Sequence, residues 1–489
     1  MSRIIDLFYK NVDKSPNKIA IICEDSTYTY KQLELLTNQL SNILKNNGVN
    51  YGDNLGVLLP NNIEFVALIL AASNLGIAIT PLNPTLPSNA INQAFESADV
   101  RHIVSTKAIV SDIKLEISGY KLILEEGILK NISSDRIDNN QVTGEEALIF
   151  TMTSGSTGNP KPIVLSQKNK IDRAFAAIEL YSVTENDNIL AATPLYHSLA
   201  ERLVIMPLIL GATSILMPRF SPSIWLKAIK EKSITFTIAV SSQLRQIAEV
   251  LTSPYVPEIT TLRCVVSSSA LLEPHTKKEL VNKLHCDFHE CYGTSEIAIA
   301  TNLNIIDSKE KMKSVGRAIK NVDVKILLGD NTFAGVDEIG EIICNTPMLF
   351  MGYYKQPKMT EDAMFGEYFR TGDLGKIDED GFLYFVDRQK DLIISGGINV
   401  YPNDVEEVVS KFENVVECAA FPYPDENLGE VVALAIVVDN EFDLRKFKFH
   451  CAKNLADFQL PRKYFVLDCL PRNNMGKLVK HKLVELLIE

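Results

Sequence analysis

Hydroxyl side chains, glycines and one lysine crowd the segment TSGSTGNPK, residues 153–161. Glycine gives the backbone conformations that gather several N–H groups into an anion-binding concavity. The serine and threonine hydroxyls add hydrogen-bond donors, and Lys161 adds a positive charge on a long stem. This set, placed directly after an apolar run, points to a loop that binds polyphosphate. A flexible loop rich in turn-forming residues has the same composition, so composition alone leaves both interpretations open.

The segment is not a Walker A loop, because Gly155 and Gly158 are followed by Asn-Pro-Lys rather than Gly-Lys-Ser/Thr. Three further motifs follow along the chain: ECYGTSE at residues 290–296, YFRTGDLGKIDEDGFLYFVDRQKD at 368–391 and LPRNNMGKLVK at 470–480. In this order the four motifs resemble the adenylate-forming superfamily of acyl-CoA synthetases, aryl-CoA ligases, luciferases and carrier-loading adenylation domains. The resemblance runs from YTYKQL near the start to GKLVKHKL near the end.

The resemblance implies a reaction in two steps. A carboxylate attacks the α-phosphate of ATP, which gives an acyl-adenylate and pyrophosphate, and a thiol then displaces AMP. ATP, Mg²⁺ and CoA are thereby implied. The residues implied to bind the nucleotide are Thr153, Ser154, Gly155, Ser156, Thr157, Gly158, Lys161, Ser269, Ala270, Leu271, Tyr292, Gly293, Thr294, Ser295, Asp373 and Arg388.

Several of these implied roles also have a physical reason. Tyr292 offers adenine a flat face, with plain core packing as the alternative. Glu296 offers Mg²⁺ a hard oxygen ligand, assisted by phosphate oxygens, and the alternative is an ordinary surface carboxylate. Asp373 can accept from both ribose hydroxyls. Arg388 is expected to reach the ribose or a phosphate, with a surface ion pair as the alternative.

Three residues are implied to act in the reaction or its conformational step. Lys477, in NMGKL, is implied to bridge the substrate carboxylate and the α-phosphate when the C-terminal part closes; a tail lysine that binds nothing is the alternative. Lys390 matches the hinge position, with a solvated lysine as the alternative. His197, in PLYHSLAER, matches an aromatic gate between the phosphates and the acyl tunnel, although a lone histidine is more often structural.

The resemblance also bears on the acid. Amino-acid-activating relatives place an aspartate just after the position of His197, where this chain has Ser198, so a fatty or aryl acid is favoured. Ser198 and Ser268 are implied to line the acyl pocket, and Ser268 and Ser269 narrow a wall where relatives often have a glycine pair. Candidate apolar walls, for which core packing is an equal alternative, are Ile205, Leu208 and Ile238.

For the thiol, the segment ISGGINVYPNDVE resembles that of the CoA ligases, and Gly396 and Gly397 are implied to line a narrow pantetheine passage. A carrier protein's phosphopantetheine arm would use the same passage. Pro162 stands where relatives usually have glycine, and we expect it to stiffen the phosphate loop. The favoured function is an acid–CoA ligase. A stand-alone enzyme that loads a carrier protein and a nucleotide-binding protein without turnover remain as alternatives.

A different chemistry is suggested by LHCDFHEC, residues 284–291. If this segment alternates like a strand, His285 and His289 share one face, Cys286 points to the other and Cys291 falls in the turn beyond. A tetrahedral zinc site is hard to build from that arrangement, so zinc is the minor alternative.

The elements that must position these residues alternate between short apolar runs and longer helical patterns. Strands are predicted at residues 54–60, 77–83, 101–106 and 145–153, and helices at residues 62–76 and 88–100. Ser88 is the expected cap of the second helix. This order predicts right-handed crossovers and a largely parallel sheet. The apolar run 63–80 is therefore predicted as a buried helix and a strand, with a membrane span as the minor alternative.

The residue pattern changes near Lys390, where a charged stretch is followed by a glycine pair and an acidic helical segment. This change predicts a domain boundary. We expect an N-terminal AMP-binding domain at residues 1–389, which the resemblance describes as parallel β/α layers with a β-barrel-like subdomain. A small, mobile α+β domain at residues 390–489 would carry Lys477, and strands are predicted in it at residues 415–424 and 430–438. The fold class is α/β.

Composition sets the remaining limits. The net charge of −12 disfavours non-specific binding to nucleic acid or to an anionic membrane, since both need a positive field. Eight cysteines without a CxxC pair indicate a reduced, cytoplasmic chain rather than a disulfide framework. The first residues lack the long apolar region of a signal peptide.

Overall fold

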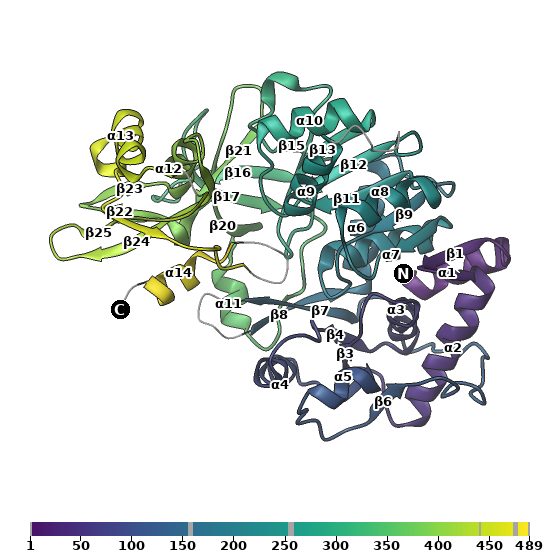
Figure 1. Ribbon diagram of the computed structural model, residues 1–489. Coiled ribbons are helices and arrows are strands. Elements are labelled where there is room, and N and C mark those ends of the chain that lie inside the picture. The colour runs from purple at the N-terminus through teal and green to yellow at the C-terminus, as the bar shows by residue number, and fades with distance from the viewer. Residues whose placement is uncertain (1, 155–159, 253–258, 440–441, 473–477, 488–489) are drawn as a thin grey trace. The chain divides into compact units, whose positions relative to one another are not determined.

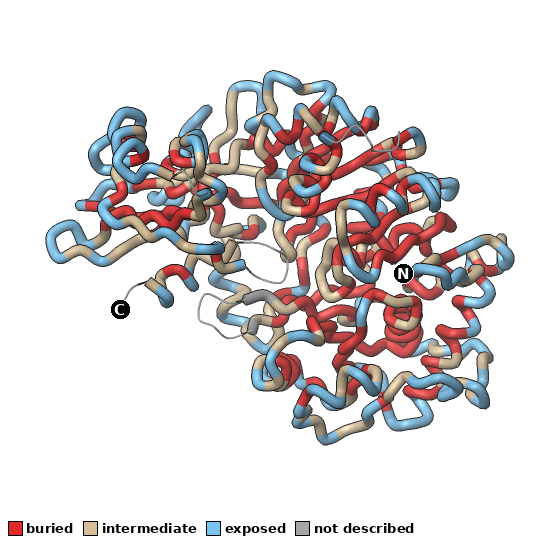
Figure 2. Tube along the Cα trace, viewed as in Figure 1, coloured by how far each residue is buried: buried red, intermediate tan, exposed pale blue. Residues whose placement is uncertain are grey.

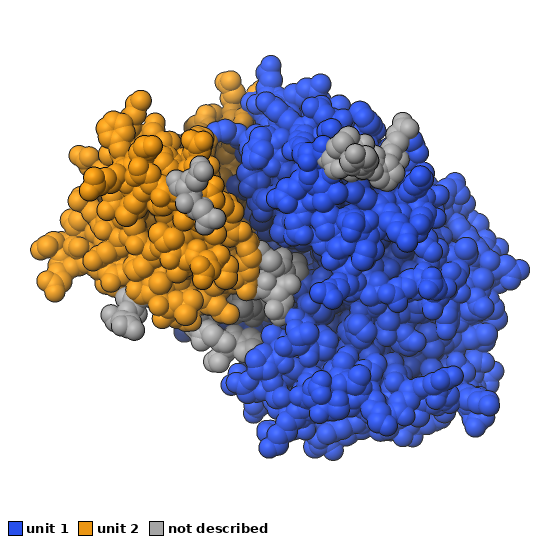
Figure 3. All heavy atoms as spheres, viewed as in Figure 1, with its two compact units in different colours: residues 1–323, 345–369 blue, residues 324–344, 370–489 orange. Residues whose placement is uncertain are grey.

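The computed structural model describes residues 2–154, 160–252, 259–439, 442–472 and 478–487 of the chain. The chain divides into two compact units (Figure 3). Unit 1 comprises Met1–Asp323 and Asn345–Phe369, and unit 2 comprises Val324–Cys344 and Arg370–Glu489. The expected boundary at Lys390 lies inside unit 2, so the division at residues 389 and 390 stays a prediction.

One sheet of unit 1 has seven strands in the order β18-β8-β7-β4-β3-β5-β6 (Figure 1). The strands are β3 (Asn54–Leu58), β4 (Ala78–Pro81), β5 (His102–Thr106), β6 (Lys121–Leu124), β7 (Ala147–Ser154), β8 (Pro160–Ser166) and β18 (Gly352–Tyr353). β3 pairs in parallel with β4 and β5, and β4 pairs in parallel with β7. The four strands predicted in this region are confirmed, as is their parallel arrangement.

The second sheet of unit 1 has nine strands in the order β15-β14-β13-β12-β11-β9-β10-β1-β2. The strands are β1 (Ile19–Cys23), β2 (Ser26–Thr29), β9 (Asn188–Ala191), β10 (Thr213–Leu216), β11 (Phe236–Val240), β12 (Cys264–Ser268), β13 (Asp287–Tyr292), β14 (Thr301–Asn304) and β15 (Arg317–Ala318). The central pairs are parallel, from β1 with β10 to β12 with β13. The carboxyl ends of these parallel strands therefore share one edge, where ligands of α/β proteins usually bind.

Helices fill the space between the two sheets and cover their outer faces. The contacts of α6 reach β8 of the first sheet, whereas those of α7 reach β9, β10 and β11 of the second. The inner helices are α1 (Ile4–Lys14), α3 (Ile63–Leu75), α6 (Gln167–Leu180) and α7 (Ser198–Leu210). The other helices of unit 1 are α2 (Tyr30–Asn46), α4 (Ser88–Ser97), α5 (Lys107–Asp112), α8 (Pro222–Glu231), α9 (Ser241–Leu251), α10 (Pro274–Leu284) and α11 (Pro357–Asp362). Figure 2 shows the inner layer and both sheets as the most buried part of unit 1.

The inner helix α3 follows the predicted pattern closely. The side chain of Asn62 accepts from the backbone N–H of Phe65 at 3.0 Å, and Gly76 ends the helix in the left-handed conformation. Every residue of α3 except Glu64 is buried, which explains the long apolar run. None of the described helices has the length and apolar character needed to cross a membrane.

Ser88 does not cap α4, contrary to our expectation. Pro87 occupies the capping position, and Ser88 is the first helical residue. The Ser88 hydroxyl instead accepts from the backbone N–H of Lys114 at 3.2 Å. The sequence signal was correct for the start of the helix but one residue off for its cap, because a tertiary partner competes for the hydroxyl.

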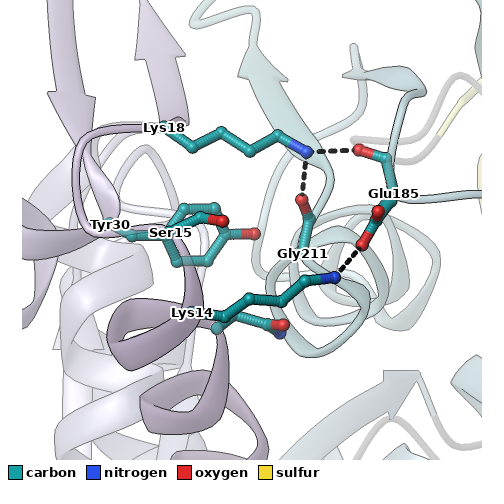
Figure 4. A pocket seen from close by; sticks show the side chains of 7 residues that line it. Lys14, Ser15, Lys18, Tyr30, Glu185 and Gly211 are labelled. Atoms are coloured by element: carbon teal, nitrogen blue, oxygen red, sulfur yellow. Dashed lines mark hydrogen bonds and ion pairs between the residues drawn. The ribbon is translucent and has the colours of Figure 1, made fainter.

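A small pocket of about 50 Å³ lies where α1, β1 and α7 meet (Figure 4). Lys18 donates to the carbonyls of Glu185 and Gly211, at 2.6 Å each, and Lys14 pairs with the Glu185 carboxylate at 2.6 Å. Both ammonium groups are thus committed to protein oxygens. The pocket ties the N-terminal helix to the second sheet and offers little to a ligand.

Most strands of two further five-stranded sheets belong to unit 2. The first follows the order β16-β17-β20-β19, with β21 against β20. It is the region that we expected to be barrel-like, but the described strands do not pair into a closed ring. Its strands are β16 (Asp323–Leu327), β17 (Gly340–Asn345), β19 (Met364–Phe365), β20 (Tyr368–Ile377) and β21 (Leu383–Arg388); β19 and some end residues of the other strands belong to unit 1. The second sheet follows the order β23-β22-β25-β24, with β26 against β25.

The second sheet and its helices form the α+β part expected at the C-terminal end. Its strands are β22 (Ile393–Ser395), β23 (Ile398–Val400), β24 (Val415–Asp425), β25 (Gly429–Val438) and β26 (Lys463–Val466). Its helices are α12 (Pro402–Val409), α13 (Leu444–Asn454) and α14 (Lys480–Leu487). Apolar residues of β25, α12 and α13 share one core around Phe447. The predicted strands at 415–424 and 430–438 are confirmed as the antiparallel pair β24–β25.

Candidate active site

The strands that flank the predicted phosphate loop, β7 and β8, form an antiparallel pair. Thr153 lies opposite Lys161 in the register of the pair, and Ser154 lies opposite Pro160. Lys161 is partly buried. The backbone register therefore places residues 153 and 154, at the end of β7, opposite the start of β8, which carries Lys161. Four predicted phosphate ligands lie outside the described residues: Gly155, Ser156, Thr157 and Gly158.

Pro162 lies within β8, opposite Met152, rather than in the loop itself. Its carbonyl accepts from the backbone N–H of Tyr354, at 3.0 Å, on the side of β18. Because the N–H and C=O of one residue in an antiparallel ladder point to the same neighbour, the missing N–H also faces β18. The proline therefore removes a bond to a two-residue edge strand and spares the pairing of β7 with β8.

The segment after β12, predicted to border adenine, has an unusual backbone. Ser269 has a φ of 79°, in the left-handed region that favours glycine. This conformation gives a physical reason for the glycines that relatives often carry there. The Ser241 hydroxyl, at the start of α9, donates to the carbonyls of Ser268, at 3.3 Å, and Ala270. The turn is thus fixed by the neighbouring helix.

Two further bonds hold the same segment from both sides. Arg245 of α9 donates to the carbonyl of Leu271 at 3.0 Å. The N–H of Leu272 donates to the buried carboxylate of Glu290 at 2.9 Å, and that carboxylate also pairs with buried Lys277. These bonds keep the backbone of the predicted adenine border rigid.

Strand β13 ends at Tyr292, and a tight loop follows. A Cβ added at Gly293 would lie 1.6 Å from the carbonyl oxygen of Ala298, so glycine is required there. The Thr294 carbonyl accepts from the N–H of Ala298 at 2.9 Å, which closes the loop. The Thr294 hydroxyl is buried and has no hydrogen-bond partner among the described residues.

Glu296, the predicted magnesium ligand, is held through both its backbone and its side chain. Arg173 of α6 donates to the Glu296 carbonyl at 2.7 Å, to the Ser295 carbonyl at 2.9 Å and to the Met348 carbonyl at 2.9 and 3.1 Å. The Tyr353 hydroxyl donates to Glu296 Oε1 at 3.0 Å. A carboxylate oriented in this way, whose Oε2 accepts no hydrogen bond from the described residues, fits a hard ion such as Mg²⁺ that takes its other ligands from phosphates and water.

His197 immediately precedes α7. Its ring lies edge-on to that of Tyr196, with 4.5 Å between the ring centroids. Burial lowers the pKa of His197 to about 4, so the ring is neutral at pH 7. Its Nε2 is buried without a hydrogen-bond partner in the described part of the chain. A neutral ring whose Nε2 has no polar partner among the described residues suits a gate better than a general base.

Ser198, predicted to line the acyl pocket, begins α7. Its hydroxyl lies 3.5 Å from Nζ of Lys170 on α6, and Lys170 forms a buried ion pair with Glu201. Ser268, the other predicted lining residue, ends β12. The three candidate walls are buried: Ile205, Leu208 and Ile238. Burial fits both an acyl wall and core packing, so their role stays a prediction.

Within unit 2, Asp373 of β20 and Arg388 of β21 are direct partners across an antiparallel pair. Arg388 Nε lies 3.5 Å from Asp373 Oδ1, and Asp373 is 5% exposed. The Thr371 hydroxyl accepts from the N–H of Asp373 at 3.1 Å. The two residues predicted to bind the ribose and a phosphate, 15 positions apart in sequence, are therefore adjacent.

Comparison with models of known protein families identifies the family of this chain. The model described as AMP-binding enzyme matches residues 8–354, and the model described as AMP-binding enzyme C-terminal domain matches residues 404–477. The chain belongs to the AMP-binding enzyme family. The first match contains the phosphate hairpin, Tyr292 and Glu296, and the second ends at Lys477.

Relatives of this AMP-binding enzyme include several acid–CoA ligases. It is 29% identical to the long-chain-fatty-acid–CoA ligase FadD13 of Mycobacterium tuberculosis, over 94% of this chain and 93% of the relative. It is 28% identical to the 2-succinylbenzoate–CoA ligase of Listeria monocytogenes, over 97% of this chain and 98% of the relative. Among solved structures, it resembles o-succinylbenzoate CoA synthetase of Bacillus subtilis bound to its acyl-adenylate, with a TM-score of 0.88, 27% identity and coverage of 98% and 97%.

The residues predicted for the later steps of the AMP-binding enzyme lie in unit 2. Lys390 is exposed in a single 3-10 turn, Gln389–Asp391. Gly396 and Gly397 form the turn between β22 and β23, with φ values of 57° and 82°. The predicted catalytic Lys477 lies outside the described residues. The hinge, passage and catalytic roles of these residues stay predictions.

Two residues that hold Glu296 were missed by sequence reasoning. Arg173 lies within the amphipathic pattern of a helix, where an arginine is ordinarily a surface residue, yet it is 2% exposed. Tyr353 lies 57 positions after Glu296, in the short edge strand β18. Neither has a local signal, because their partners are backbone carbonyls and a distant carboxylate.

The arrangement expected for residues 284–291 is wrong. His285 is not in a strand; it ends α10 with a φ of 50°. Cys291 lies inside β13 rather than in the turn beyond it. His289 faces Asn302, whose amide lies 3.0 Å from Nδ1, and the ring of Tyr181. The helix extends further than the alternation suggested, because the left-handed conformation at His285 provides its C-terminal end. All eight cysteines lie in the described part of the chain, where the structure has no disulfide.

Proposed function

We propose that this AMP-binding enzyme is an ATP-dependent acid–CoA ligase. In the first step an oxygen of the substrate carboxylate attacks the α-phosphorus of ATP, and the bond to the bridging oxygen of pyrophosphate breaks. In the second step the sulfur of CoA attacks the acyl carbon, and the bond to AMP breaks. The similarity to ligases of fatty and aryl acids over nearly the whole chain supports this proposal.

The observation that carries the proposal is the way in which the chain holds Glu296. Arg173 supplies four hydrogen bonds to three carbonyls around the loop, and Tyr353 orients one carboxylate oxygen. The same loop begins at Tyr292, the proposed adenine contact. A bound Mg²⁺ would withdraw charge from the phosphates. Glu296 would hold that ion, and the hydroxyls and Lys161 of the β7–β8 hairpin would bind the leaving pyrophosphate.

In the proposed reaction, Asp373 accepts from the ribose hydroxyls and Arg388 contacts the ribose or a phosphate. Lys477 bridges the carboxylate and the α-phosphate and so relieves their repulsion. His197 separates the phosphates from the acyl group as a neutral ring. Its low pKa removes it as a proton carrier at pH 7, and the carboxylate nucleophile needs no base.

The preferred acid is a fatty or aryl acid rather than an amino acid, since Ser198 offers no carboxylate to a substrate ammonium. We place the reaction in the cytoplasm. The second candidate is a stand-alone enzyme that loads a carrier protein, since the turn at Gly396 and Gly397 would suit either pantetheine donor.

Pyrophosphate exchange over a panel of fatty, aryl and short-chain acids tests the first step. We expect exchange that requires ATP, Mg²⁺ and an acid, and that Lys477→Ala abolishes. Exchange that persists in Lys477→Ala would refute the role given to that lysine. Comparing CoA with a holo-carrier protein as acceptor then decides between the two candidates, and a strong preference for the carrier would refute the ligase.

A further inference from the structure

Three cationic side chains lie close together between the sheets of unit 1: Lys170 and Arg173 are buried, and Arg202 is partly exposed. Lys170 and Arg173 lie on α6, and Arg202 lies on α7, the helix packed beside it (Figure 1). The positive charges of Arg173 and Arg202 both contribute to lowering the pKa of Lys170, so the three groups lie within electrostatic range of one another. Buried charges are costly unless they are paired or fully hydrogen-bonded.

Two of these three cations are satisfied by the protein. Lys170 forms its ion pair with Glu201, whose side chain is fully buried. Arg173 donates to the carbonyls of Ser295, Glu296 and Met348. Each therefore has a structural role that accounts for its burial.

Arg202 has no such role in the described part of the chain. Its Nε is buried without a hydrogen-bond partner among the described residues, while the side chain as a whole is partly exposed. Glu201 is its neighbour in sequence, but adjacent helical residues do not face each other, and Glu201 is already paired with Lys170. The guanidinium of Arg202 thus lacks a counterion among the described residues, and its partly exposed side chain remains accessible to a ligand.

The position of Arg202 indicates what it faces. It lies one helical turn after Ser198, on the same side of α7. The groups that oppose the lowering of its pKa by burial are Cys291, Tyr181 and Glu201. Cys291 belongs to β13, and the register that pairs Ser267 with Glu290 places Ser268 of β12 beside it. Arg202 therefore lies in the region of both residues assigned to the acyl pocket, Ser198 and Ser268.

We propose that Arg202 binds a second anionic group on the acid substrate, so that the enzyme activates a dicarboxylic acid or an acid of equivalent charge. This inference rests on the proposed ligase function and refines its substrate class. The reacting carboxylate is a poor alternative partner, because it becomes an uncharged acyl group in the adenylate and would leave Arg202 unpaired. A carboxylate at the far end of the acid keeps its charge through both steps.

Matched pairs of acids test the inference. The pairs are glutarate with pentanoate, adipate with hexanoate, and phthalate with benzoate, each compared by kcat/KM in pyrophosphate exchange. We expect the wild-type enzyme to prefer the diacid of at least one pair by roughly ten- to hundredfold, the usual effect of one hydrogen-bonded charge pair. Arg202→Met should abolish that preference, and Arg202→Lys should keep part of it. Arg219→Met, the same exchange at an exposed arginine of unit 1, is the matched control and should keep the wild-type preference.

Calorimetric titration with the preferred diacid gives a readout that does not need turnover, and thermal melting shows whether each variant folds. Binding to the wild type that is lost in Arg202→Met and weakened in Arg202→Lys would support the inference. Exchange with monocarboxylates alone, or an equal loss for both acids of a pair in Arg202→Met, would overturn it while leaving the ligase function intact. Absence of exchange with every acid would overturn the ligase function itself.

Discussion

At the scale of single residues, His197 is the clearest source of pH-dependent stability. Its folded-state pKa, about 4, lies below the ordinary value of 6.5 because burial disfavours the charged ring. Between these values the unfolded chain binds a proton that the folded chain does not. The contribution of His197 to the free energy of unfolding therefore falls as the pH drops from 6.5 to about 4, by roughly 3 kcal/mol in total.

His197→Gln should remove this contribution. Chemical denaturation of wild type and variant across that pH range gives the difference in unfolding free energy, which should change progressively with pH. His481→Gln removes an exposed histidine and serves as the control. A wild-type-minus-His197→Gln difference that is constant with pH would show that the ring titrates normally and is not buried as described.

Arg173 is a positioning residue for Glu296, because it acts on the loop's carbonyls rather than on substrate. Arg173→Lys keeps the charge but loses the planar fork that serves three carbonyls at once. We expect kcat for pyrophosphate exchange to fall roughly 10²-fold, as for a small misplacement of reacting groups, and the Mg²⁺ concentration for half-maximal rate to rise. Arg219→Lys is the matched control. Unchanged Mg²⁺ dependence in a folded Arg173→Lys variant would contradict the positioning role.

At the scale of elements, the backbone of the hairpin β22–β23 favours glycine at both turn positions, Gly396 and Gly397. Positive φ at both central residues is typical of the two-residue turns that join twisted strands. Gly397 has open space around an added Cβ, so the cost of a substitution there comes from the backbone. Asparagine tolerates this conformation better than other residues, whereas valine does not.

We therefore expect Gly397→Val to lower the free energy of unfolding by about 1–2 kcal/mol and Gly397→Asn to lower it less. If the turn also lines the pantetheine passage, both variants should slow thioester formation while pyrophosphate exchange continues. Gly366→Asn is the control, since Gly366 also has positive φ and open space but lies in a turn of unit 1. Normal thioester formation in a folded Gly397→Asn variant would argue against the passage.

The success of prediction from sequence also differs between elements. Local signals were sufficient for α3, where a polar cap, a glycine end and a continuous apolar run coincide. They failed at residues 284–291, where the left-handed turn at His285 has no distinctive sequence. They could not find Arg173, because the burial of a cation depends on partners from other elements. The predicted phosphate motif is visible in the sequence because glycine and hydroxyl residues are concentrated in one segment.

At the scale of the whole molecule, the contacts around Lys390 join residues on both sides of the proposed hinge within unit 2. The carboxylate of Asp387 accepts from the N–H of Asn403, near the start of α12, at 2.9 Å. The Asn403 amide donates back to the carbonyl of Val386 at 2.6 Å. Burial raises the pKa of Asp387, although the nearby ammonium of Lys480 opposes that change. These contacts stabilise one backbone conformation at Lys390, and a rotation about that backbone would break them.

Lys390→Pro tests whether such a rotation belongs to the reaction. Proline fixes φ near one value, so a hinge that must change φ would be confined to one setting. We expect the variant to retain one half-reaction, either pyrophosphate exchange or thioester formation from a supplied acyl-adenylate, and to lose most of the other. Lys390→Ala removes the exposed side chain but leaves the backbone free, so it should retain both. A proline variant that performs both half-reactions at wild-type rates would show that the backbone at Lys390 does not need to turn.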